Sequence, residues 1–235
     1  MISGHSGNYF SWGKTYEVLI RERIAYSAAY ATEDSSGELC FSKLMASLPL
    51  FPLSTIVLPG GQLPLRIFEP RYVSMVSSSM KSGDGFGICL ISSGSEVGAV
   101  AKPFAYGTLV EIIDWDQEDS GLLVIVTKGL RKFRIVDSKA NSEGLLVGEV
   151  ELLPYEEKTA IPAEYGSLVD LLQRVLEHVR PLIAHAESDF TDATWVSSRL
   201  VELLPMSVAE RHDLVAMSDP LERLLALQDV IDSKA

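Results

Sequence analysis

The sequence has few of the residues that build metal and redox sites. Its 235 residues include two cysteines and four histidines. Cys40 and Cys89 cannot form a metal site by themselves, and Cys89 lies in the apolar run 88–91, where a buried reduced thiol is expected. His178 and His185 are too far apart in sequence for the two histidine ligands of a zinc helix, which are four residues apart. The sequence therefore predicts no metal site and no cofactor.

Motifs for catalysis and nucleotide binding are also missing. The sequence has no Gly-x-x-x-x-Gly-Lys-[Ser/Thr] phosphate loop. The glycine-rich segment 83–87 lacks the spacing of a dinucleotide-binding loop, so a turn is expected there. Segment 94–98 has serine as its second residue rather than its third, so it is not a nucleophile elbow. We expect no catalytic residues and therefore no enzyme.

Long apolar runs and a basic leader are absent from the sequence. No stretch approaches the 18 or more apolar residues of a membrane-spanning helix. The N-terminus has no basic start followed by an apolar core and a small-residue cleavage site, so a secretion signal is not expected. These features predict a cytoplasmic protein without a membrane partner.

Basic residues are scarce in the last third of the chain. The formal net charge is −12, and residues 153–235 carry 15 acidic against 7 basic side chains. Such a surface repels a phosphate backbone, so nucleic acid is an unfavourable partner. One basic cluster in the middle of the chain leaves RNA binding open as an alternative. The cluster consists of Lys128, Arg131, Lys132 and Arg134.

Proline, by contrast, is concentrated between residues 48 and 73, in an apolar and β-branched run. Proline cannot donate a hydrogen bond to a sheet, so these prolines predict short strands that lie at edges or are separated by bends. The extended segments expected downstream are 54–58, 63–68, 85–92, 106–115, 122–128, 131–136 and 145–152. One helix is expected over 70–81, with proline at its first position. Together they suggest a closed or nearly closed antiparallel β-structure.

After residue 154 the apolar period changes from about two to about 3.6, which indicates helices. One apolar stripe runs over 168–183, and a second helix is expected to start near Thr191 or Asp192. Ser207 and Glu210 form the pattern of a capping box, and Asp219 before Pro220 is typical of a further helix start. The sequence thus predicts an α+β protein in which a C-terminal helical bundle follows a β domain.

Three segments are expected. Residues 1–46 form an N-terminal extension, with one possible helix over 16–30, residues 47–155 form the β domain, and residues 156–235 form the helical part. Met45 is the expected natural start of the protein, so that the preceding segment is spurious or disordered. The alternative is a genuine arm that packs on the body.

Several motifs occur in one order along the chain. They are Leu-Pro-Leu-Phe-Pro-Leu at 48–53, Leu-Pro-Gly at 58–60, Pro-Leu-Arg-Ile-Phe-Glu-Pro-Arg-Tyr at 64–72, Gly-Thr-Leu-Val-Glu-Ile at 107–112 and Gly-Leu-Arg-Lys-Phe-Arg-Ile at 129–135. Helical motifs follow at 204–207 and 219–224. Over about residues 47–233 this series resembles the Lon N-terminal domain family, the substrate-recognition part of the ATP-dependent protease La.

The resemblance implies a PUA-like β-barrel followed by a helical bundle. It also implies a non-catalytic module, similar to the short stand-alone members of the family, without the ATPase and protease domains. The partners implied are unfolded or apolar polypeptide segments, or another protein. An RNA-binding PUA-like protein is the alternative.

The candidate binding residues are Arg66, Phe68, Arg71 and Tyr72, at the turn between a strand and the helix over 70–81. Two guanidinium groups beside two aromatic rings can form the lip of a peptide-binding cleft. The interpretation we favour for this turn is structural: Glu69 caps the helix while an arginine neutralises it. For the acidic run 114–119, a solvated hairpin tip is favoured over a cation site, and packing at the surface edge or in the core is favoured for Trp115 and Trp195.

Overall fold

The computed structural model describes residues 31–33, 39–41, 44–179 and 188–234. The chain divides into two compact units, Met1–Leu44 and Met45–Ala235. In the first, strands β1 (Ala31–Glu33) and β2 (Leu39–Phe41) pair antiparallel. The helix expected over 16–30 lies outside the described residues. The expected start at Met45 and the expected boundaries after residues 46 and 155 stay predictions.

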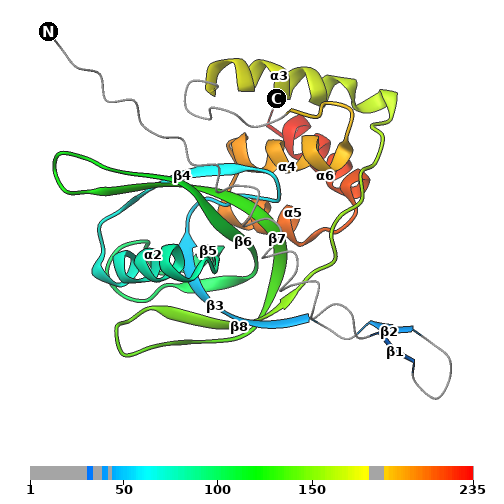
Figure 1. Ribbon diagram of the computed structural model, residues 1–235. Coiled ribbons are helices and arrows are strands. Elements are labelled where there is room, and N and C mark those ends of the chain that lie inside the picture. The colour runs from blue at the N-terminus through cyan, green and yellow to red at the C-terminus, as the bar shows by residue number, and fades with distance from the viewer. Residues whose placement is uncertain (1–30, 34–38, 42–43, 180–187, 235) are drawn as a thin grey trace, which may run out of the picture. The chain divides into compact units, whose positions relative to one another are not determined.

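A six-stranded sheet dominates the rest of the chain (Figure 1). Its strands are β3 (Leu44–Leu53), β4 (Gln62–Ile67), β5 (Phe86–Ser93), β6 (Lys102–Gln117), β7 (Leu123–Ala140) and β8 (Leu146–Leu152). Their order is β4-β7-β6-β5-β3-β8, and β7 also pairs with β8. Because the long strand β7 is a neighbour of β4, β6 and β8, the sheet curls back on itself. This makes a mixed α/β protein with a sheet-rich domain.

The strand expected over 54–58 is wrong. Strand β3 ends at Leu53, although Ile56, Val57 and Leu58 are almost completely buried. The backbone at Leu58 is satisfied by side chains instead of a neighbouring strand. Its N–H donates to Glu202 Oε1 at 2.5 Å, and its carbonyl accepts from Arg199 at 3.2 Å. The apolar composition of 54–58 therefore indicates burial and not a strand. A buried loop is possible here because helix α4 supplies hydrogen-bond partners for its backbone.

The prediction that prolines exclude a central strand is also wrong for β3. This strand carries Pro49 and Pro52 and lies between β5 and β8, and it runs parallel to β5. A missing backbone hydrogen bond costs about 1 kcal/mol, whereas burying a large apolar side chain contributes about 1.5–3 kcal/mol. Leu50, Phe51 and Leu53 are all buried, so burial outweighs the missing donors. Strand β4, which contains Pro64, does lie at one end of the strand order.

The two strands expected over 122–128 and 131–136 are one continuous strand, β7. Gly129, between them, serves a close backbone approach and makes no turn. A Cβ at this position would lie 2.2 Å from the carbonyl oxygen of Leu58. The Gly129 N–H donates to the Gly61 carbonyl, and the Gly60 N–H donates to the Gly129 carbonyl, both at 2.9 Å.

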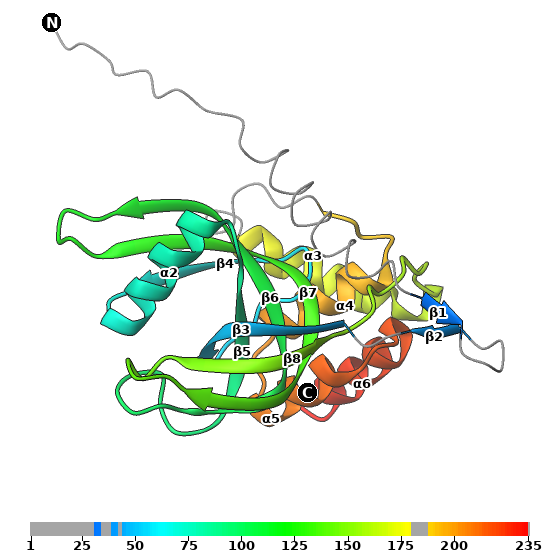
Figure 2. The same ribbon diagram turned by 60° about the horizontal axis from the view of Figure 1, so that its bottom comes forward.

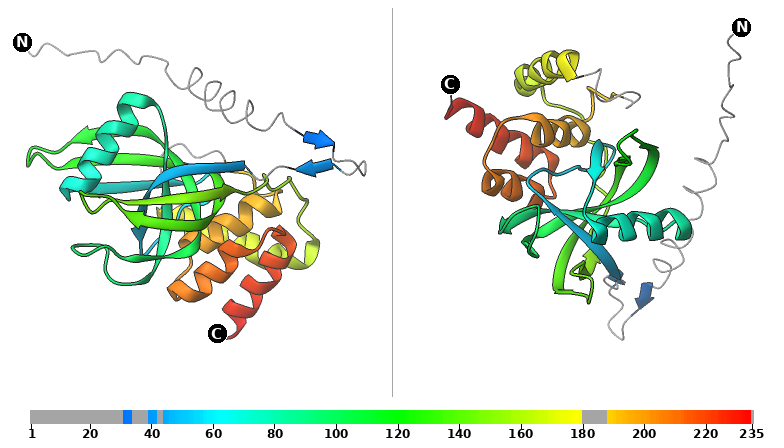
Figure 3. Two further views of the ribbon diagram at one scale, coloured as in Figure 1. Left: turned by 90° about the horizontal axis from the view of Figure 1, so that it is seen from below. Right: turned by 90° about the vertical axis from the view of Figure 1, so that its left-hand side faces the viewer.

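The helices of the second unit lie in two places (Figures 2 and 3). Helix α2 (Pro70–Ser82) crosses the sheet by itself. A short helix η1 (Ala163–Tyr165) leads into α3 (Gly166–Val179), α4 (Ala193–Leu203), α5 (Val208–Ala216) and α6 (Pro220–Asp232), which gather on another side. The helix-start signals are confirmed: Asp192 and Asp219 are N-caps, and Ser207 with Glu210 forms a complete capping box.

Sheet and helices share one core. Buried side chains from the sheet, from α2 and from α4 and α6 belong to a single contiguous cluster. Phe51 of β3 stacks on Tyr72 of α2 with ring centroids 4.0 Å apart, while Leu200 of α4 and Leu224 of α6 are fully buried. This shared core fixes the helices on the sheet, so exposed groups around them are held in place.

Candidate functional site

The corner between β4 and α2 contains the four candidate binding residues, and the structure divides them into two pairs. Arg71 and Tyr72 are buried. The Arg71 guanidinium pairs with Glu69 at 2.9 Å, donates to the Gly144 carbonyl at 3.1 Å and lies 4.7 Å from the centroid of the Tyr72 ring. Burial raises the pKa of Tyr72. This pair fastens the corner, and Glu69 is the N-cap residue without a side-chain capping bond.

Arg66 and Phe68 lie on the surface of the same corner. The Phe68 side chain is 59% exposed, which is a large fraction for an aromatic ring. Arg66 forms an exposed ion pair with Glu118, at 2.9 Å, which connects the corner to the hairpin of β6 and β7. These two are the candidates that remain available to a partner.

Next to the corner is a three-stranded ribbon, here called the arm, formed by residues 62–67 of β4, 111–117 of β6 and 123–128 of β7. In the arm, Leu65 and Trp115 both pair with Ile125, and Arg66 and Asp116 both pair with Val124. Its hairpin projects away from α3–α6 (Figures 1 and 2).

Strand β5 pairs with β6 only as far as Val110, opposite Phe86. Among the described residues, β6 therefore has no neighbouring strand on its second side between 111 and 117. All five residues from 113 to 117 are exposed, and the exposed fractions of Ile113 and Trp115 are 43% and 56%. Trp115 therefore lies at the surface of this strand edge, whereas Trp195 of α4 is half-buried against Phe190.

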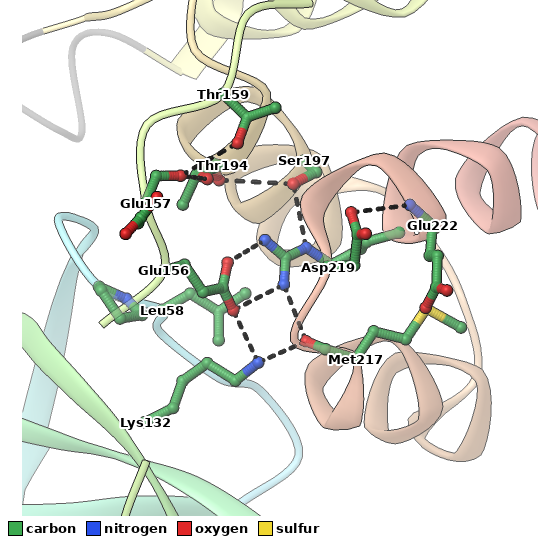
Figure 4. Close-up of polar contacts among 12 residues, drawn as sticks. Leu58, Lys132, Glu156, Glu157, Thr159, Thr194, Ser197, Met217, Asp219 and Glu222 are labelled. Carbon is green, nitrogen blue, oxygen red and sulfur yellow. Dashed lines mark hydrogen bonds and ion pairs between the residues drawn. The ribbon is translucent and has the colours of Figure 1, made fainter. Parts of the chain in front are cut away.

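The junction between sheet and helices has a different character, with a buried charge network (Figure 4). The Lys132 Nζ of β7 donates to Glu156 at 2.9 Å and to the Met217 carbonyl at 2.6 Å. Arg223 of α6 binds the same carboxylate through two nitrogens and donates to Ser197 of α4. The side chains of Lys132, Glu156 and Arg223 are 4%, 11% and 0% exposed. The network joins β7, the segment after β8, α4 and α6.

Electrostatics in this network favour the charged carboxylate. Burial opposes the charge on Glu156, but Arg223 and Lys132 together hold the pKa of this carboxyl below its usual value. Burial also lowers the pKa of the Lys132 ammonium, and Glu156 only partly offsets that. Two cations around one carboxylate form a structural clamp, because all three groups are occupied by one another.

The basic cluster that left RNA binding open is largely occupied inside the protein. Lys132 is in the clamp. Arg134 forms an ion pair with Glu151 at 2.5 Å, and the Arg131 guanidinium lies over the Tyr155 ring while its Nε donates to the Leu153 carbonyl. These contacts hold three of the four basic side chains against the protein, which counts against a phosphate backbone as the partner.

A pocket of about 60 Å³ lies beside the clamp, between Pro59, Tyr155 and Ser198. A water molecule needs about 10–15 Å³ of such volume, so the pocket has room for a few waters only. Pockets for small-molecule ligands are typically about 300–1,000 Å³. The junction is therefore a poor candidate for the binding of a substrate segment, compared with the corner and the arm.

The cysteine and histidine side chains of the described residues do not form a metal site. The parts of the chain that the structure describes contain no group of three or more His, Cys, Asp or Glu side chains arranged to hold a metal ion. Cys89 is a free, fully buried thiol whose pKa is raised by burial, as expected from its apolar run. His178 is exposed, and its Nδ1 contacts the Arg174 carbonyl. His185 lies outside the described residues.

Comparison with known families assigns this fold to a family. The family model of the ATP-dependent protease La (LON) substrate-binding domain matches residues 47–233. The chain therefore belongs to the Lon substrate-binding domain family.

Solved structures support the assignment. A Lon N-terminal domain protein from Xanthomonas campestris is 38% identical, with a TM-score of 0.65 over 78% of this chain and 98% of the other. The N-terminal domain of a Lon protease from the Mycobacterium avium complex is 20% identical, with a TM-score of 0.55 over 78% of this chain and 97% of the other. The second likeness concerns the fold alone.

Among curated proteins, the chain is similar to protein cereblon. It is 27% identical to the protein from Gallus gallus over 46% of this chain and 24% of the relative. It is 30% identical to the protein from Danio rerio over 46% of this chain and 26% of the relative. The alignment thus spans about a quarter of the length of these relatives.

Sequence reasoning found the corner but missed the open side of β6. The residues 113–117 were visible in the sequence as an acidic run with a tryptophan, and the hairpin was expected. Their exposure on both faces depends on where β5 stops pairing, which is a property of the sheet register. The only signal was that Trp115 lies among four acidic residues, an unfavourable composition for a packed core.

Proposed function

We propose that this protein is a non-catalytic module that recognises unfolded or apolar segments of other polypeptides. The observation that carries the proposal is the match of residues 47–233 to a substrate-binding domain, rather than to a catalytic domain. The substrates and partners of longer relatives are not transferred by this match, because fold and function are separable. The proposal therefore rests on a surface of this chain as well.

That surface consists of the exposed part of the corner together with the arm. Phe68, Ile113 and Trp115 offer apolar area that does not contribute to the core. Large exposed aromatic side chains on a rigid element are typical anchors of protein interfaces. The buried pair Arg71 and Tyr72 keeps the corner rigid, so binding there does not require ordering of the protein.

The finer architecture also belongs to this proposal. The pairing of β7 with both β6 and β8 supports a PUA-like barrel, and the mutual packing of α3–α6 supports a helical bundle. Among the described residues, no helix combines the length and the apolar content needed to cross a membrane. We also propose a cytoplasmic location, which the free thiol of Cys89 and the family support.

The test compares an unfolded polypeptide with its folded form. Reduced and carboxamidomethylated lysozyme is expected to bind to the full-length protein, while native lysozyme does not. The variant Phe68→Ser is expected to weaken binding by about fivefold or more, because a single aromatic anchor often carries much of the binding energy. Isothermal titration or fluorescence anisotropy measures both.

The matched control is Leu225→Ser on α6, since Leu225 is 55% exposed and lies away from the corner. It should leave binding unchanged. Equal binding of native and unfolded lysozyme would contradict the proposal. An equal loss of affinity in Phe68→Ser and Leu225→Ser would contradict it as well. Tight binding of labelled single-stranded RNA at physiological salt, without binding of the unfolded chain, would support the RNA-binding alternative instead.

A further inference from the structure

The open side of β6 in the arm combines an unpaired strand edge with two exposed carboxylates. Strand residues 113–117 have no neighbouring strand on that side among the described residues, because β5 stops pairing at Val110. An unpaired strand edge offers N–H and C=O groups to another extended chain.

Two backbone donors of this edge are already engaged by carboxylates. Asp114 Oδ1 accepts from the Trp115 N–H at 2.9 Å, and Asp116 Oδ1 accepts from the Gln117 N–H at 2.8 Å. Successive N–H groups of a strand point to opposite sides, so those of Trp115 and Gln117 point to the same side. Since the alternate groups serve the ladder with β7, the two carboxylates lie along the open edge.

The charges of these two carboxylates are not neutralised by an ion pair among the described residues. Glu118, at the tip of the hairpin, is paired with Arg66, but neither Asp114 nor Asp116 has an ion pair within the described part of the chain. A neutral strand that docks on this edge has to compete with the carboxylates for the two N–H groups. A strand that carries lysine or arginine gains an ion pair at each carboxylate instead.

The spacing of the edge fits an extended partner. Asp114 and Asp116 are two residues apart in a strand, roughly 6.6 Å at about 3.3 Å per residue, which is also the spacing of alternate side chains in an extended chain. The side chain of Trp115, between them, points to the opposite face and is 56% exposed. A partner strand that alternates basic and apolar residues thus presents cations to the aspartates and apolar groups to the tryptophan.

We propose that residues 113–117 of β6 form a docking edge for an extended polypeptide segment in which lysine or arginine alternates with apolar residues. This inference deepens the proposed function, because it names the class of segment recognised, and it depends on that function. The Phe68 corner supplies general apolar contact, whereas the docking edge selects for positive charge.

The test uses three synthetic twelve-residue peptides that alternate valine with lysine, glutamine or glutamate, and that carry one fluorescent label. In 50 mM salt, we expect the lysine peptide to bind the full-length protein about tenfold more tightly than the glutamine peptide does. The glutamate peptide is expected to bind more weakly than either. The lysine preference should decrease in 500 mM salt, because exposed charges are then screened.

The decisive variant is Asp114→Asn/Asp116→Asn, in which each amide oxygen can still accept the neighbouring N–H. It should weaken binding of the lysine peptide by about three- to tenfold and leave the glutamine peptide unchanged. The control is Asp170→Asn/Asp229→Asn, which makes the same change of net charge at exposed positions on α3 and α6. Trp115→Ser should weaken the binding of both the lysine and the glutamine peptide.

Equal affinity for the lysine and glutamine peptides would overturn the docking edge, as would equal effects of the two double variants. Neither result touches the proposed function if unfolded lysozyme still binds in a manner that depends on Phe68. If unfolded lysozyme does not bind and the lysine peptide does, the general proposal fails and a specific basic ligand remains. Circular dichroism of each variant establishes that the fold is retained.

Discussion

The junction clamp and the arm use the same kinds of residue with opposite results. In the clamp, Glu156 is almost buried and holds two cations, Lys132 and Arg223. In the arm, Asp114 and Asp116 are exposed, and their carboxylates accept hydrogen bonds from the neighbouring backbone N–H groups. Charge that is satisfied internally holds the sheet and helices together, whereas charge and apolar area left without a partner remain available for recognition.

The clamp should be far more sensitive to mutation than the arm. Glu156→Gln removes the carboxylate and leaves two buried cations close together, so we expect a loss of about 3–5 kcal/mol in the free energy of unfolding. Urea denaturation followed by circular dichroism measures this. The control Lys234→Ala breaks an exposed ion pair with Glu210 and should cost less than about 1 kcal/mol. Similar losses in both variants would contradict the distinction between buried and exposed charge.

The same clamp predicts a pH dependence of intermediate size. The pKa of Glu156 is lowered in the folded protein, so its stabilising effect is complete above the ordinary value of 4.5 and disappears as the pH falls through the lowered value. The difference in unfolding free energy between the wild type and Glu156→Gln should therefore be largest near neutral pH and shrink below about pH 4.5.

Urea titrations at several pH values between 3 and 7 test this prediction. Asp170→Asn, at an exposed position on α3, serves as the reference and should stay within about 0.5 kcal/mol of the wild type throughout. A difference for Glu156→Gln that grows on acidification would show that the carboxylate is not the stabilising form.

The smallest stability effects are expected in the recognition surface. Phe68→Ser and Trp115→Ser should each change the free energy of unfolding by no more than about 0.5 kcal/mol, because both side chains are more than half exposed. Thermal and urea unfolding measure this. A loss of more than about 2 kcal/mol in either variant would show that the ring belongs to the core. Weaker binding by that variant would then reflect its lower stability and not a lost contact with the partner.

Local sequence signals predicted the ends of elements well. The helix starts at Asp192, Ser207 and Asp219 followed from side chains that bond the first free N–H groups of each helix, which is a local interaction. The family could also be predicted, because its motifs are short and lie in a fixed order over 47–233. Proline predicted an edge for β4, whose Pro64 lies at the end of the strand order.

Long-range hydrogen bonding explains the failures. The run 54–58 has the composition of a strand, but Arg199 and Glu202 satisfy the backbone of Leu58 from more than 140 positions away in sequence. Residues 122–136 were predicted as two strands, whereas the missing side chain of Gly129 lets one continuous strand contact the loop before β4. Neither partner is visible from the local sequence.

The candidate site was predictable in part. The sequence directed attention to Arg66, Phe68, Arg71 and Tyr72 and offered a binding and a fastening interpretation for the whole set. The fold separates them, since Arg71 and Tyr72 fasten the corner while Arg66 and Phe68 remain exposed. The four residues are close in sequence, so only their burial could divide them.

The sequence by itself determined the family, the helix caps and the lack of a phosphate loop or nucleophile motif, because each of these depends on residues that are close together in the chain. The tertiary structure decided which charges are neutralised and which remain available. Lys132 and Asp116 are both charged residues of the β-rich part, yet one is buried against Glu156 and the other lies on an open strand edge. That difference arises from which strands and helices become neighbours, and it separates the clamp from the surface that we propose for recognition.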